Sequence, residues 1–173
     1  RRSSDLGRAF AVNGNLSKGK IRGVGLTFVI CFIVGSVLFM PLDREYIIYL
    51  ILLACIMLSG YLDDASDKPW SDYKKGLIDL IISAVTMLTF LNYNPTAIYI
   101  GSMELIIPKA VYIILGIVLI WISINVTNCS DGVDGLCASL CCVAILSFSL
   151  IFREALGNYV IADFLFVAVL FAY

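Results

Sequence analysis

Two adjacent aspartates, Asp63 and Asp64, follow Gly60-Tyr61-Leu62 at the end of a long apolar run. Like charges at this distance repel, so one carboxyl group takes up a proton unless a cation holds the pair. Magnesium prefers oxygen ligands and typically uses one or two carboxylates together with substrate phosphates. The pair is therefore a candidate magnesium and phosphate site, while a helix end that simply meets water accounts for two aspartates equally well.

The segment 125–135 carries polar residues at every third position, and a glycine follows each of its two aspartates. The four polar residues are Asn125, Asn128, Asp131 and Asp134. On a continuing helix they form one stripe that faces away from lipid, and the glycines let the backbone approach a ligand closely. Polar groups beside a membrane span are costly unless they face water or a ligand. The segment therefore favours a binding loop over a plain turn between helices.

Three cations, Lys18, Lys20 and Arg22, alternate with glycines just before the first apolar run. Helix N-termini favour anions, so a phosphate or diphosphate is a natural ligand for this segment. Attraction to anionic lipid head groups is the alternative interpretation. Lys74 and Lys75 allow the same two interpretations.

Composition assigns the chain to a class. Apolar residues make up 61% of the 173 residues and charged residues 14%, against roughly 45–50% and 25% in soluble domains. A soluble enzyme and a disordered chain are therefore excluded. The formal net charge of −1 excludes a bulk basic protein that binds nucleic acid. The sequence contains no histidine, which removes the usual general base and zinc ligand.

Five apolar runs are near the roughly 17–25 residues that a spanning helix needs, and a sixth begins at Tyr159 and is still apolar at Tyr173. The five runs cover residues 24–42, 46–62, 76–93, 106 or 111 to 126, and 136–152. Polar turns separate them at Asp43-Arg44-Glu45, Asn94-Pro95-Thr96 and Leu156-Gly157-Asn158. We therefore predict an all-α fold, a multi-pass transmembrane helical bundle with five full spans plus a truncated sixth. Residues 1–173 form one integral-membrane domain in this prediction.

Most of the six cysteines lie inside these apolar runs, where cysteine behaves as a small hydrophobic residue. Cys137 and Cys141 are four residues apart, a spacing that a metal can use, but no histidine or second cysteine pair supports such a site. Packing within the membrane is the better interpretation.

Orientation follows from the positive charges. Nine of the twelve lysines and arginines lie in segments 1–23, 63–75 and 127–135, which alternating spans place on one side of the membrane. The excess of positive charge predicts that this side is cytosolic, with residues 1–23 as a cytosolic lead-in. Most acidic residues lie on the same side, so we expect the chemistry there.

The two acidic motifs resemble those of the polyprenyl-phosphate N-acetylhexosamine-1-phosphate transferases. Gly60-Tyr61-Leu62-Asp63-Asp64 is similar to the aspartate-pair motif of this superfamily. Residues 125–136 resemble its motif Asn-x-x-Asn-x-x-Asp-Gly-x-Asp-Gly-Leu at every specified position. Ser130 stands where the branch that transfers phospho-N-acetylmuramoyl-pentapeptide carries threonine, whereas the sugar-only branches tend to carry an aliphatic residue. The chain is therefore most similar to the first of these branches.

This resemblance implies transfer of phospho-N-acetylmuramoyl-pentapeptide from its UDP carrier to undecaprenyl phosphate, with release of UMP. It implies a Mg²⁺ cofactor and a place in the bacterial inner membrane with the active face in the cytosol. The catalytic residues that it implies are Asp63, Asp64 and Asp131, of which Asp64 and Asp131 also bind the metal. The substrate-binding residues that it implies are Lys18, Lys75, Asn125, Asn128 and Asp134. The expected partners are UDP-MurNAc-pentapeptide, undecaprenyl phosphate and the lipid bilayer, without nucleic acid, and a homodimer is left open.

By the same resemblance, the chain corresponds to about the second to seventh spans of a ten-span enzyme and is expected to be inactive alone. The family's third catalytic aspartate and its histidine-rich loop have no counterpart in this sequence. Asp67 stands where the family has a lysine, and Cys129 stands where it has a leucine.

Two alternatives remain open at this point. The first is a sister transferase that moves N-acetylhexosamine-1-phosphate from a UDP-sugar to the same lipid. The second is an ion-coupled membrane carrier, because Asp79 and Asp163 lie within apolar runs and such residues often mark ion paths.

Overall fold

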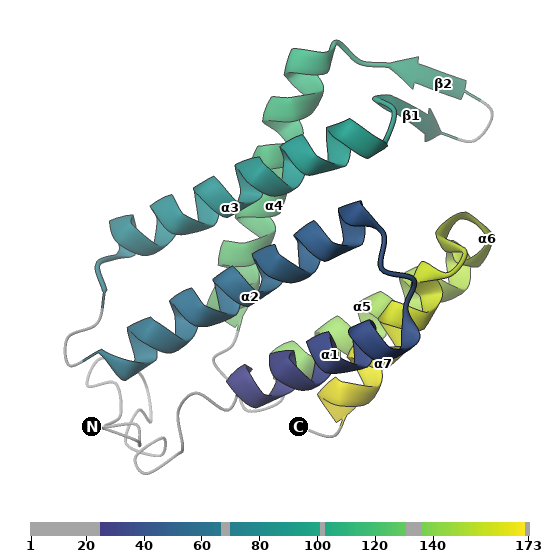
Figure 1. The fold of residues 1–173 in the computed structure, drawn as a ribbon. Coiled ribbons are helices and arrows are strands. Elements are labelled where there is room, and N and C mark those ends of the chain that lie inside the picture. Colours follow the sequence, from purple (N-terminus) through teal and green to yellow (C-terminus); the bar gives the residue numbers. More distant parts are fainter. Residues whose placement is uncertain (1–24, 67–69, 101–102, 131–135, 172–173) are drawn as a thin grey trace.

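The computed structural model describes residues 25–66, 70–100, 103–130 and 136–171, which are mostly helical. The helices are α1 (Gly25–Phe39), α2 (Arg44–Ala65), α3 (Asp72–Tyr93), α4 (Lys109–Ser130), α5 (Leu136–Ile151), α6 (Arg153–Leu156) and α7 (Tyr159–Phe171). A short hairpin of β1 (Ala97–Ile100) and β2 (Met103–Ile106) lies between α3 and α4 (Figure 1). The prediction of a helical membrane bundle is confirmed.

The helices alternate in direction, so the bundle has two distinct ends (Figure 1). The corner between α1 and α2, the β-hairpin and α6 lie at one end, which we call the hairpin end. The C-terminal ends of α2 and α4 and the N-terminal end of α3 lie at the other, which we call the site end. The alternation agrees with the predicted division of the loops between the two sides of a membrane.

Three helices are long enough and apolar enough to cross a bilayer: α2, α3 and α4. Each has 22 residues, or about 33 Å at 1.5 Å per residue. The other apolar helices, α1, α5 and α7, have 15, 16 and 13 residues. α1 is shorter than its apolar run because proline disfavours helix at the preceding residue, and Pro41 follows Met40. α5 ends where the chain turns through α6 and Gly157, whose φ is 54°.

The β-hairpin was not predicted from the sequence. β1 pairs antiparallel with β2, with Ala97 opposite Ile106 and Ile100 opposite Met103. Isoleucine and tyrosine favour strands, and only Gly101-Ser102 separate the two strands, a connection typical of hairpins. Ile106, proposed as one start of the fourth apolar run, therefore belongs to a strand.

Hydrogen bonds at the hairpin end join the α1–α2 corner to α7, and α2 to α3. The Asp43 carboxylate accepts from the Tyr46 backbone N–H and from the Tyr159 hydroxyl, each at 2.8 Å. Glu45 Oε1 accepts from Asn94 Nδ2 at 2.8 Å, and Asn94 is the C-cap of α3. The turns predicted at residues 43–45 and 94–96 are therefore present, and their side chains lock neighbouring helices together.

The buried core lies where α1, α2 and α7 meet. Its members are Phe32, Met40, Tyr46, Leu50 and Ala162. The Phe166 ring on α7 makes edge contacts with the Phe28 and Phe32 rings on α1, both at 5.2 Å between centroids.

Large apolar side chains also cover much of the outer surface. Leu38, Leu119 and Leu150 are 68–70% exposed although they lie in three different helices. Soluble monomers rarely expose apolar patches of this extent, whereas lipid solvates them.

Gly35→Leu is expected to destabilise the protein by about 1–3 kcal/mol through overpacking. A Cβ at Gly35 would lie 2.8 Å from Leu165 Cδ2 and 3.3 Å from Leu165 Cγ, so α1 and α7 must separate. Gly60→Leu is the matched control, because a Cβ there meets no atom within 4 Å among the described residues. Thermal unfolding midpoints in detergent compare the two variants, and equal midpoints would contradict close packing of α1 on α7.

Candidate functional site

Asp63 lies in the last turn of α2, at the site end. The backbone N–H and the hydroxyl of Ser66 both donate to the Asp63 carbonyl, at 3.2 and 2.7 Å, and end the helix there. The Asp63 carboxylate accepts from Lys75 Nζ at 2.6 Å and from the Trp70 backbone N–H at 2.7 Å. The Asp63 side chain is only 16% exposed. This one carboxylate therefore joins the end of α2 to the beginning of α3.

The first turn of α3 separates two adjacent lysines. Ser71 caps the helix, and its hydroxyl accepts from the Lys74 backbone N–H at 3.4 Å. The Lys74 ammonium lies 3.4 Å from the centroid of the Trp70 ring, a cation–π contact, while Lys75 pairs with Asp63. Positive charge at a helix N-terminus opposes the helix dipole, and Asp63 and the Trp70 ring offset that cost. The result is a cationic helix start, the kind of place where proteins bind phosphate groups.

The C-terminal half of α4 contacts this turn. Trp121 Nε1 on α4 donates to the Gly76 carbonyl on α3 at 2.9 Å. Asn125, one turn further along α4, donates from Nδ2 to the Trp121 carbonyl at 2.8 Å. The half-buried Asn125 side chain therefore lies along the helix next to Trp121. These contacts bring α4 to the same end as Asp63 and Lys75.

Among the predicted site residues, the structure brings Asp63 and Lys75 into direct contact. Asn125 joins them indirectly, through Trp121 and Gly76. The backbone at positions 64 and 128 lies in α2 and α4, but the side chains of Asp64 and Asn128 are outside the described part of the chain. The remaining predicted site residues, Lys18, Asp131 and Asp134, also lie outside the described residues.

The predicted magnesium site lies largely beyond the described residues. Within residues 25–66, 70–100, 103–130 and 136–171, no three histidine, cysteine, aspartate or glutamate side chains gather as metal ligands. The proposed ligands Asp64 and Asp131 are not among the side chains described there. Magnesium binding therefore stays a prediction.

Sequence reasoning did not single out the two tryptophans of the site. Trp70 supplies a backbone N–H to Asp63 and a ring to Lys74. Trp121 ties α3 to α4. One signal was present, because Trp121 precedes Asn125 by four residues and so shares its helix face.

The intramembrane aspartates that suggested an ion carrier have separate surroundings. Asp163 Oδ2 on α7 lies 2.7 Å from the hydroxyl oxygen of Ser149, a buried residue of α5. Asp79 lies on α3, one turn after Lys75, and its backbone carbonyl accepts from the Ser83 hydroxyl. The two carboxylates therefore lie in different helix pairs, an arrangement that does not favour one continuous ion path.

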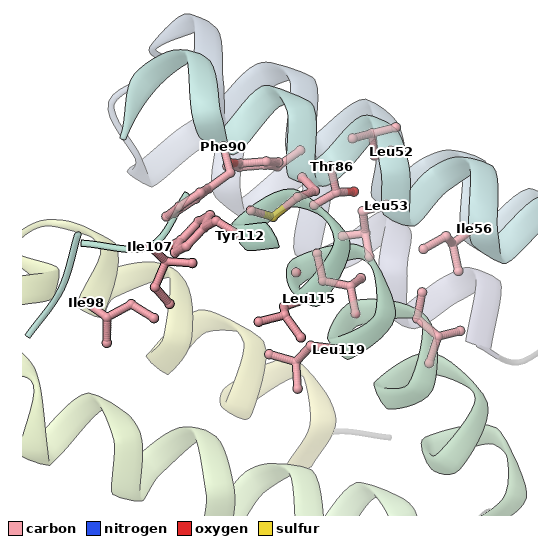
Figure 2. Close-up of a pocket in the computed structure, with 15 residues that line it drawn as sticks. Leu52, Leu53, Ile56, Thr86, Phe90, Ile98, Ile107, Tyr112, Leu115 and Leu119 are labelled. Carbon is pink, nitrogen blue, oxygen red and sulfur yellow. The ribbon is translucent and has the colours of Figure 1, made fainter. Parts of the chain in front are cut away.

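An apolar cavity of about 710 Å³ lies between α2, α3 and α4. Figure 2 shows Leu53 and Ile56 from α2, Phe90 from α3 and Leu119 from α4 around it. Ile98 of β1 lines it near the hairpin end, and Ile124, which precedes Asn125, lines it near the site end. The lining supplies few polar atoms, so the cavity suits an apolar chain and offers no group for acid–base chemistry.

Comparison with known proteins agrees with this arrangement. The chain is 34% identical over 168 residues to the phospho-N-acetylmuramoyl-pentapeptide-transferase of Treponema pallidum, equally in two strains, one of subspecies pallidum and the other strain Nichols. The matches cover 94% of this chain and 46% of each relative, so the chain spans about half the length of these curated relatives. No solved structure gave a significant match. Residues 46–173, which contain Asp63, Lys75 and Asn125, match the family model described as Glycosyl transferase family 4, and the chain belongs to that family.

Proposed function

We propose that the protein transfers phospho-N-acetylmuramoyl-pentapeptide from its UDP carrier to undecaprenyl phosphate on the cytosolic face of the bacterial inner membrane. The observation that carries this proposal is the Asp63–Lys75 pair, 2.6 Å apart, at one end of a membrane bundle. The pair joins an acidic helix end to a cationic helix start, so it combines a carboxylate with groups that attract phosphates. The similarity to the Treponema transferases supports the choice of substrates.

The reaction asks for positioning and charge neutralisation more than for a strong base. A phosphate oxygen of the lipid attacks the phosphorus next to the sugar, and the bond to the UMP phosphate breaks. UMP leaves with the electrons of that bond, and the lipid gains a diphosphate-linked sugar. The second pKa of a phosphate monoester is about 6, so the acceptor is mostly dianionic near neutral pH.

Lys75 has the clearest role among the described residues. Its ammonium reaches the Asp63 carboxylate and remains 36% exposed, so a phosphate can approach it from the aqueous side. Asp63 accepts one contact through each carboxylate oxygen, which leaves lone pairs for a further donor. Asp63 therefore both places Lys75 and presents negative charge beside the phosphates.

We propose Mg²⁺ as the cofactor, held by Asp64 and Asp131 and neighboured by Asp63. The donor set fits, because carboxylate and amide oxygens are the ligands that this ion prefers. When bound, it would neutralise negative charge on the phosphates. Lys18, Asn128 and Asp134 complete the proposed substrate contacts.

The apolar cavity supports a lipid acceptor. The cavity extends from Ile98 near the hairpin end to Ile124 near the site end. A polyprenyl chain lying along α4 would therefore bring its phosphate toward Asn125 and the first turn of α3.

Donor choice tests this proposal against the sister activity. Membranes containing the protein, expressed from its complete gene, receive undecaprenyl phosphate, Mg²⁺ and either UDP-MurNAc-pentapeptide or UDP-GlcNAc. We expect UMP release with the first donor at least about tenfold faster than with the second, and loss of release when EDTA removes the metal. UMP release with UDP-GlcNAc alone would establish the sister transferase instead.

A further inference from the structure

Trp121 occupies a position that the proposed reaction does not yet use. Its indole N–H donates to the Gly76 carbonyl across the α3–α4 interface, 45 residues away in sequence. Gly76 directly follows Lys75, so the bond fixes the backbone next to the lysine that pairs with Asp63. The indole thus acts on the turn that carries the cation.

Glycine at position 76 permits this approach. A Cβ built there would lie 3.9 Å from Trp121 Cζ2, so the ring rests directly over the α-carbon. The Trp121 side chain is half-buried in this contact. A half-buried indole usually finds a partner for its N–H, and the carbonyl supplies it.

Trp121 also belongs to the polar face of α4. Positions 121, 125 and 128 are spaced i, i+4 and i+7, so they follow one another along a single helix face. Asn125 Nδ2 donates to the Trp121 carbonyl, which fixes Asn125 against the same turn of α4. The indole bond therefore sets the position of the asparagine face relative to Lys75.

The other end of the α3–α4 pair has its own contact. The rings of Phe90 on α3 and Tyr112 on α4 stack with centroids 6.5 Å apart, toward the hairpin end. This contact lies far from Lys75 along both helices. Loss of the indole bond would thus loosen the site end while the hairpin end remains clamped.

We propose that Trp121 is a positioning residue, whose indole N–H holds Lys75 on α3 in register with the asparagine face of α4. With the Asp63–Lys75 pair, this bond makes the site ends of α2, α3 and α4 one unit. Phosphoryl transfer depends on such alignment, since small displacements of a binding group are costly. The kinetic part of this inference rests on the proposed function, whereas the structural tie does not.

The test uses Trp121→Phe, which keeps an aromatic ring and removes the donor, in protein expressed from its complete gene. Phe90→Leu is the matched control, because it weakens the same helix pair at the hairpin end. Hydrogen exchange of the amides in residues 72–80 reports the tie without any substrate. We expect faster exchange of these amides in Trp121→Phe, and wild-type exchange in Phe90→Leu.

Kinetics give the second measurement. We expect the kcat for UMP release to fall about five- to tenfold in Trp121→Phe, as loss of one hydrogen bond and its alignment implies. Phe90→Leu should lower the thermal midpoint at least as much and leave kcat unchanged. Unchanged exchange in Trp121→Phe, or faster exchange with wild-type kcat, overturns the positioning role. A wild-type protein that releases no UMP overturns the proposed function instead, and exchange alone then decides whether the tie exists.

Discussion

Asp63→Asn in the protein expressed from its complete gene is expected to lower turnover by about 10²–10³-fold or more, the usual effect of removing one charged or dipolar group that stabilises a transition state. Asparagine keeps the shape of the side chain but has one acceptor oxygen where aspartate has two. The carboxylate oxygens of Asp63 accept separately from Lys75 Nζ and from the Trp70 backbone N–H. The variant must give up one of these partners, or place its amide group against the Lys75 ammonium.

The matched control is Asp72→Asn. Asp72 is exposed in the first turn of α3, close in sequence to the same loop. Its loss removes the same charge from the same end of the bundle, so a general electrostatic effect would lower turnover in both variants. We expect near-normal turnover in Asp72→Asn and a normal thermal midpoint in both. Near-normal turnover in Asp63→Asn would show that the site assignment is wrong.

Asp64→Asn and Asp131→Asn are expected to show losses of the same size, because an amide lacks the charge that binds magnesium. Titration of activity with Mg²⁺ separates these two positions from Asp63. If Asp64 and Asp131 are the metal ligands, their variants should need more Mg²⁺ for half-maximal activity. Asp63→Asn should show its loss chiefly in the rate at saturating Mg²⁺.

The order of the helices could be predicted because membrane spans leave a strong signal. Apolar runs of this length rarely occur outside membrane proteins, and the turns at Asp43, Asn94 and Gly157 fall where the helices end. The β-hairpin could not be found in the same way, since its four-residue strands are apolar and merge with the neighbouring runs. The lengths of α1 and α5 were also overestimated, because an apolar run does not reveal where its helix stops.

The site was predicted as residue types and not as contacts. The sequence identified Asp63 and Lys75 separately, but nothing in their spacing of twelve residues shows that they pair. That contact depends on how α2 and α3 pack, and on the Trp70 N–H that fixes the carboxylate. Trp121 escaped notice for a related reason, since a tryptophan in an apolar run is normally a lipid-facing or packing residue. Its role becomes visible only when Gly76 is placed opposite its indole N–H.

Cysteine labelling is expected to give an all-or-none result for orientation. The excess of lysine and arginine predicts that the site end faces the cytosol. In a background without native cysteines, a cysteine at Thr96 should react with a membrane-impermeant maleimide added outside spheroplasts. A cysteine at Ser71 should react only after the membrane is opened, because Ser71 lies at the site end, where it caps α3.

Two further positions control for the local effects of these substitutions. Ser71 caps a helix and its loss costs about 1 kcal/mol, so a cysteine at Tyr73, which is 92% exposed, provides the same test without removing the cap. Ile106, 75% exposed on β2, does the same for the hairpin end. Labelling at positions 71 and 73 from outside, with protection at 96 and 106, would invert the orientation. It would also place the Asp63–Lys75 pair away from any cytosolic nucleotide donor, and the proposed reaction would then have to be abandoned.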